Sequence, residues 1–112
     1  MDEAQFDAKR EKFLSQIDLQ NDPLEKKIEE AWNKIAKKQG WVVRKMKNRD
    51  ENSDPDRMYM RNGEMFFIEF KRRGKVQTDA QKLKAREIME KGGFKVYVID
   101  VVDKPLAELM FL

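Results

Sequence analysis

The sequence predicts an α/β fold in which a mixed sheet is flanked by helices, and three segments carry this prediction. Apolar residues recur with helical spacing from Leu24 to Ala36. Two apolar runs flank the pair Asn62-Gly63, a strong short-range signal for a two-residue hairpin turn. A helix over residues 78–91 then leads into an apolar strand over residues 94–100. Such a helical crossover favours parallel pairing of the last strand with an earlier one.

An amphipathic helix is predicted ahead of this pattern. Its apolar positions lie near helical spacing among charged residues and are Phe6, Phe13, Leu14 and Ile17. The apolar stripe needs a partner, which is either the rest of the same domain or a second copy of the chain. We therefore expect an N-terminal helical extension over residues 1–21 and a main domain over residues 22–112.

The boundaries of the main elements follow from capping and turn residues. Asp22 caps a helix with Pro23 in its first turn and Glu25 three residues after the cap, and Gly40 ends that helix. A strand is expected from Trp41, followed by a polar loop over residues 48–55. After the last strand, an apolar tail at residues 106–112 is expected to pack on this domain or on a partner.

Composition limits the chemistry. The chain has 112 residues, 40% of them hydrophobic, which is enough for one modest core. It has no cysteine and no histidine, which excludes disulfides, thiol nucleophiles, histidine bases and zinc sites with nitrogen or sulfur ligands. Any catalysis must therefore use carboxylates, lysines or a hard metal ion.

Charge is distributed unevenly. Residues 1–30 carry nine acidic and five basic residues, whereas residues 31–112 carry nineteen basic and twelve acidic ones. A basic surplus of this kind is compatible with a phosphate-bearing partner. No long apolar run is present and the N-terminus is acidic, so we expect a cytoplasmic protein.

The hairpin places two acids together. If Asn62 and Gly63 form the turn, Asp56 lies directly opposite Glu69, with Cβ atoms about 4.5–5.5 Å apart. Two carboxylates so placed repel unless a cation or a proton intervenes, and an all-oxygen site suits Mg²⁺ or Mn²⁺. Strand alternation puts Lys71 on the same face, with Phe66, Ile68 and Phe70 toward a core. The alternative is an exposed hairpin face that happens to be charged.

The wider context resembles the Pro-Asp…(Asp/Glu)-x-Lys nucleases, and within them the virus-type replication-repair nuclease (VRR-Nuc) family. The resemblance covers about residues 22–100. It begins with a helix that carries Glu25 and ends at Gly40-Trp41, and it continues through five segments. These are Ser53-Asp54-Pro55-Asp56-Arg57, Ile68-Glu69-Phe70-Lys71, Gly74-Lys75, Thr78-Asp79-Ala80-Gln81 and Gly93-Phe94-Lys95-Val96-Tyr97-Val98. The family usually has glycine where this chain has Ser53.

The resemblance implies a restriction-endonuclease-like sheet and a Mg²⁺- or Mn²⁺-dependent DNA endonuclease. Asp56, Glu69 and the backbone carbonyl of Phe70 would hold the metal, and Lys71 would orient or activate the attacking water. Stand-alone members of the family resemble Holliday-junction resolvases, so branched DNA and a homodimer are expected. The alternatives are a non-catalytic DNA-binding module on the same fold, or a nuclease specific for flaps or ends. The spare apolar stripe near the N-terminus and the tail at residues 109–112 are candidate dimer interfaces. A phage origin fits such a small nuclease.

Two further residues have competing interpretations. Glu25 matches an acid of the family's first helix and would approach the metal, but it also fits a capping box. On a helical wheel it is aimed closer to the apolar stripe than Glu29. Gln81 matches a family glutamine near the scissile phosphate, but it can instead cap a helix with Thr78. Three basic residues beside this site are expected to contact DNA phosphates: Arg72, Arg73 and Lys75.

Overall fold

The computed structural model describes residues 2–14, 25–46 and 53–112. Its helices are α1 (Glu3–Leu14), α2 (Glu25–Lys38), α3 (Asp79–Glu90) and α4 (Lys104–Met110). Its strands are β1 (Val42–Lys45), β2 (Arg57–Arg61), β3 (Glu64–Phe70) and β4 (Lys95–Ile99). The expected cap at Asp22 and most of the expected polar loop over residues 48–55 lie outside the described residues.

The strands form one four-stranded sheet in the order β1-β2-β3-β4. The β1–β2 and β2–β3 pairs are antiparallel, and β3–β4 is parallel. Arg61 pairs with Glu64 and Arg57 with Ile68, which is the predicted hairpin register. Asn62 and Gly63 have φ values of 51° and 81°, as a type I′ turn requires. The predicted mixed α/β architecture is therefore confirmed.

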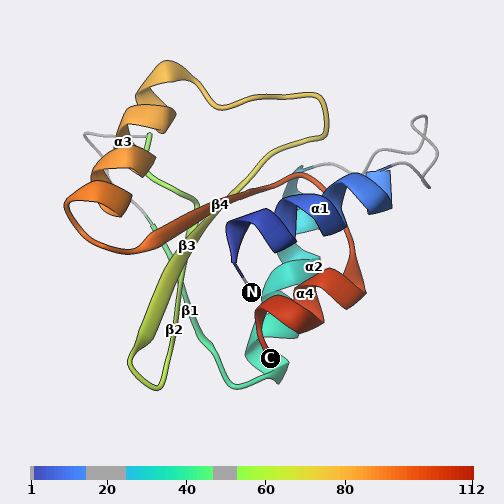
Figure 1. Cartoon of the computed structure of the whole chain (residues 1–112). Coiled ribbons are helices and arrows are strands. Elements are labelled where there is room, and N and C mark those ends of the chain that lie inside the picture. The colour runs from blue at the N-terminus through green and yellow to red at the C-terminus, as the bar shows by residue number, and fades with distance from the viewer. Residues whose placement is uncertain (1, 15–24, 47–52) are drawn as a thin grey trace.

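The helices cover the two faces of the sheet unequally. In Figure 1, α3 lies on one side of the sheet, while α1, α2 and α4 gather on the other. The predicted end of α2 is confirmed by Gly40, whose φ is +85°. Within the described parts of the chain, no helix has the length and apolar character needed to cross a membrane.

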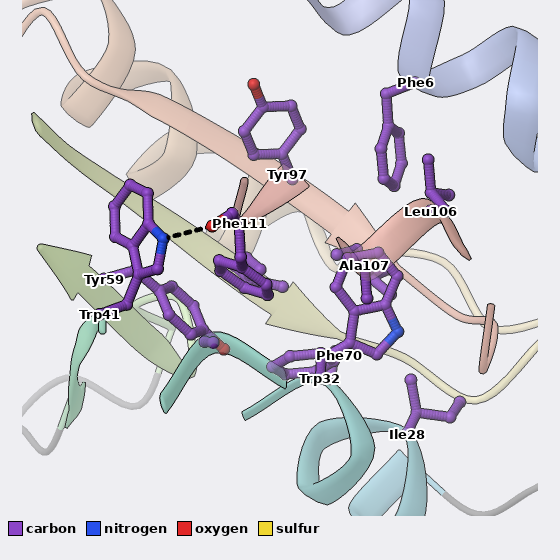
Figure 2. Close-up of a cluster of buried hydrophobic side chains, with 13 residues drawn as sticks. Phe6, Ile28, Trp32, Trp41, Tyr59, Phe70, Tyr97, Leu106, Ala107 and Phe111 are labelled. Carbon is purple, nitrogen blue, oxygen red and sulfur yellow. Dashed lines mark hydrogen bonds between the residues drawn. The ribbon is translucent and has the colours of Figure 1, made fainter. Parts of the chain in front are cut away.

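The hydrophobic core fills the space between the sheet and the three grouped helices. Phe111 is fully buried and contacts the rings of Trp32, Trp41 and Tyr59. The indole N–H of Trp41 donates to the backbone carbonyl of Phe111 over 2.9 Å, shown as a dashed line in Figure 2. Ile68 and Phe70 reach this core from β3, as strand alternation predicted.

Both terminal segments contribute to this core. Phe6 is only 2% exposed and contacts Trp32 and Tyr97, so at this position the stripe packs on its own chain. The side chains of Phe13, Leu14 and Ile17 lie outside the described set. The expected C-terminal tail is instead helix α4, which Asp103 caps and which begins with Pro105 in its first turn. Phe111 is buried in the core and so is not available as a dimer interface, whereas Leu109 and Leu112 are exposed.

Candidate active site

Asp56 sits at the start of β2, where three strands meet. Pro55 before it is fully buried, and the backbone carbonyl of Asp56 accepts a hydrogen bond from the N–H of Met46. Its side-chain Oδ2 accepts a second hydrogen bond, of 2.6 Å, from the backbone N–H of Phe70. The carboxylate is therefore anchored on one oxygen and held against the end of β3.

Glu69 occupies the position opposite Asp56 when the observed register is continued by one residue. On its other side, Glu69 pairs with Val98 of the parallel strand β4. It is only 1% exposed, and neither of its buried carboxylate oxygens has a hydrogen-bond partner within the described structure. The alternative of an exposed charged hairpin face is therefore wrong for Glu69.

Electrostatics link these two acids to Lys71 and Glu25. Burial raises the pKa of Glu69, and the charges of Asp56 and Glu25 raise it further. Burial likewise raises the pKa of Asp56, although the N–H of Phe70 opposes that shift. The charge of Lys71 lowers the pKa of Glu25, Asp56 and Glu69 alike. The ammonium group therefore acts on all three carboxyls.

A backbone hydrogen bond to β4 fixes the position of Lys71. Its N–H donates to the carbonyl of Ile99 over 2.8 Å, so the parallel pairing with β4 continues one residue past the end of β3. Lys71 itself is half-buried. Glu69, Phe70 and Lys71 are thus carried by the C-terminal end of β3, a strand paired on both sides.

The oxygen atoms around Asp56 and Glu69 fit a divalent cation that also keeps bound water. No group of three acidic side chains in residues 2–14, 25–46 and 53–112 is arranged to hold a metal ion by itself. Two carboxylates completed by a backbone carbonyl and water are nevertheless enough for Mg²⁺, which often keeps several waters. A buried carboxylate with two unpartnered oxygens is costly unless a cation or proton compensates it. Glu69 fits that requirement.

The relative positions of Glu25 and Glu29 differ from the helical-wheel expectation. Glu25 is exposed overall, although burial of its carboxyl and the charge of Asp56 raise its pKa. Glu29 is more enclosed and forms an ion pair with Arg57. The reason is that the buried stripe of α2 includes Asn33, one turn after Glu29. Asn33 accepts a hydrogen bond from the hydroxyl of Tyr59, which turns this face toward the sheet.

Gln81 forms the predicted capping box. The backbone N–H of Thr78 donates to Gln81 Oε1 over 2.9 Å, and the N–H of Gln81 donates to Thr78 Oγ1 over 3.1 Å. A different glutamine, Gln77, lies beside Glu69 and lowers its pKa. Gln77 could not be predicted from the sequence, because a glutamine in a loop carries no periodic or motif signal.

The basic residues after β3 are not equivalent. Arg72 and Lys75 are exposed, and a turn closed by a hydrogen bond from Lys75 N–H to the carbonyl of Arg72 brings them together. Both terminal nitrogens of Arg73 are buried. Arg72 and Lys75 are therefore the accessible members of the predicted phosphate-binding set.

Comparison with known proteins bears on the fold. No family model matches the chain, and no curated protein sequence does. A solved structure described as a VRR_NUC domain superposes with a TM-score of 0.63 and 23% sequence identity, covering 77% of this chain and 92% of that one.

The chain has the VRR-Nuc fold. A sequence identity of 23% shows a shared fold and no more. The fold that the sequence resemblance predicted is therefore confirmed. The chain is therefore a nuclease-fold domain. A fold does not determine a reaction, which depends on the side chains of the site.

Proposed function

We propose that this chain is a divalent-metal-dependent DNA endonuclease that hydrolyses phosphodiester bonds. The observation that carries the proposal is Glu69, a buried carboxylate with two unpartnered oxygens, set opposite Asp56 on a VRR-Nuc fold. A buried carboxylate without a partner is costly unless a cation or a proton compensates it, and acids with raised pKa values cluster at functional sites.

Each residue has a role in this proposal. Asp56, Glu69 and the carbonyl of Phe70 would hold Mg²⁺ or Mn²⁺, with Glu25 approaching from α2. When bound, the ion supplies Lewis-acid activation of water and neutralises charge on the phosphate. Lys71 would orient the attacking water and offset the negative charge that develops on the phosphoryl oxygens. Water adds across one P–O bond, so one product end carries the phosphate and the other a hydroxyl.

DNA is proposed to bind through the exposed cations beside the site. Arg72 and Lys75 adjoin Lys71 and would contact the phosphate backbone without reading the base sequence. Gln81 would contact the scissile phosphate. For that contact its side chain must release the hydrogen bond that it accepts from the N–H of Thr78. The buried guanidinium of Arg73 makes it the weakest of the proposed phosphate contacts.

We further propose structure selectivity for branched DNA and a homodimer, because cutting paired strands of a junction requires two active sites. Among the described residues, Phe6 and Phe111 are buried within the chain, whereas Leu109 and Leu112 are exposed and are proposed as part of the interface. Sedimentation of wild type and of Leu109→Lys tests this: the proposal expects a dimer that the charged variant dissociates. A wild-type monomer at micromolar concentration would contradict it.

Cleavage assays test the activity. Wild type, Asp56→Ala and Lys71→Ala are compared on four-way, flap, nicked, single-stranded and linear DNA with Mg²⁺ or Mn²⁺. Lys95→Ala is the matched control, because Lys95 is exposed at the start of β4, far along the strand from Ile99. We expect cleavage, strongest on branched DNA, that both site variants lose and the control retains. Undiminished cleavage by both site variants would contradict the proposal.

A further inference from the structure

Gln77 lies in the loop between β3 and α3, at residues 71–78, and no motif or resemblance assigns it a role. It lines a cavity of about 180 Å³ together with Val96 and Val98. Val98 is the residue that pairs with Glu69 across the parallel strands. Gln77 therefore lies near Val98, the strand neighbour of Glu69 on β4.

Polar side-chain atoms of Gln77 and Glu69 are deeply buried. Gln77 Nε2 and both carboxylate oxygens of Glu69 are shielded from solvent, and none of the three has a completed hydrogen bond. An amide N–H and an unpartnered carboxylate are complementary, because the amide can donate the hydrogen bond that the carboxylate can accept. Gln77 also lowers the pKa of Glu69, which agrees with this placement of the two side chains.

We propose that Gln77, and not Gln81, is the glutamine that positions the Glu69 carboxylate for binding a divalent cation. This inference rests on the proposed function. A neutral donor suits the task, because it fixes the orientation of one oxygen without competing for the charge that the cation needs. Gln81 lies one turn further on, and its Oε1 already accepts the hydrogen bond from Thr78 N–H.

Two matched glutamines in one segment give a controlled experiment. Gln77→Met and Gln81→Met each remove the amide while keeping a side chain of similar length. Mn²⁺ alone, without DNA, is titrated into the full chain and into each variant by isothermal calorimetry. We expect Gln77→Met to weaken Mn²⁺ binding by about 10- to 100-fold, as loss of a partner that orients a ligand does. The Mn²⁺ affinity of Gln81→Met should stay within about 2-fold of wild type. That change is much smaller than the loss expected for Gln77→Met.

Three further tests distinguish a structural defect from loss of the positioning role. Near-ultraviolet circular dichroism checks the fold, and Gln77→Ala repeats the test without added bulk. In a Glu69→Gln background, Gln77→Met should weaken Mn²⁺ binding no further, because the carboxylate that it positions is gone. Wild-type affinity in both Gln77 variants, or an equal loss in Gln81→Met, would overturn the inference while leaving the proposed function intact. A wild-type chain that binds no Mn²⁺ would overturn both.

Discussion

The carboxylate of Asp56 accepts a 2.6 Å hydrogen bond from the backbone N–H of Phe70, which ties the start of β2 to the end of β3. The residue therefore serves the fold and the candidate site at once. These two roles can be separated, because asparagine keeps the acceptor oxygen and removes the charge.

We predict that Asp56→Ala and Asp56→Asn differ in stability but not in cation binding. Alanine leaves the N–H of Phe70 without its acceptor and should cost about 1–3 kcal/mol, whereas asparagine keeps the bond and should cost less. Both variants should lose Mn²⁺ binding. Urea unfolding in the presence of EDTA measures the first effect and calorimetry the second. Equal stability losses would show that the Phe70 contact contributes nothing.

The buried charge of Glu69 should destabilise the metal-free protein at neutral pH. Its pKa is raised above the ordinary value of 4.5, so the folded chain binds this proton more tightly than the unfolded chain. That contribution to stability is present below the ordinary pKa and is lost as the pH rises through the raised value. In EDTA, the free energy of unfolding of wild type should therefore fall between mildly acidic and neutral pH.

Glu69→Gln should remove most of this pH dependence. At pH 7 in EDTA we expect it to stabilise the chain by about 1–3 kcal/mol, the usual penalty for an uncompensated buried polar group. Glu64→Gln at the exposed hairpin turn is the matched control and should change little. Thermal unfolding of wild type and both variants at pH 5 and pH 7 in EDTA measures these stability differences. Destabilisation of Glu69→Gln at pH 7 would contradict the prediction.

DNA affinity should depend on salt through Arg72 and Lys75. Each substitution by alanine should weaken binding to any DNA sequence and reduce the slope of log affinity against log salt by about 1. Fluorescence anisotropy in EDTA, which prevents cleavage, measures this slope, with Lys95→Ala as the control. Unchanged slopes for both variants would place the DNA interface elsewhere.

Helix α1 should be held to the sheet by Arg10. Its guanidinium donates to both oxygens of Asp100, over 2.8 and 2.6 Å, and Asp100 is almost fully buried at the end of β4. Arg10→Ala leaves that carboxylate without its partner and should cost about 1.5–3 kcal/mol in urea unfolding. Glu11→Ala removes only an exposed contact to Arg10 and should cost at most about 0.5 kcal/mol. Similar values for the two variants would contradict this account.

Local signals were enough to predict much of the fold. The turn residues Asn62 and Gly63 set the hairpin register, and that register is enough to predict that Asp56 lies opposite Glu69. The capping box of Thr78 and Gln81 was equally local. Helix α4 was missed because its seven residues are too few for a clear period, and its stability comes from burying Leu106 and Phe111.

The candidate site was only partly predictable, because burial depends on packing between distant segments. Glu69 is buried because its strand pairs with both β2 and β4. No local sequence pattern specifies that double pairing. Glu29 and Arg57 pair across 28 positions of sequence. The contact between Gln77 and Glu69 likewise depends on how the loop before α3 folds back onto the sheet.

Cleavage of a four-way DNA junction as a function of Mn²⁺ concentration, by wild type and by Glu69→Gln, tests the central claim most directly. The account predicts that the wild-type rate rises with Mn²⁺ and saturates, while Glu69→Gln remains folded and cuts nothing at any concentration. A Glu69→Gln variant that cuts as fast as wild type, or wild-type cutting that persists in EDTA, would contradict it.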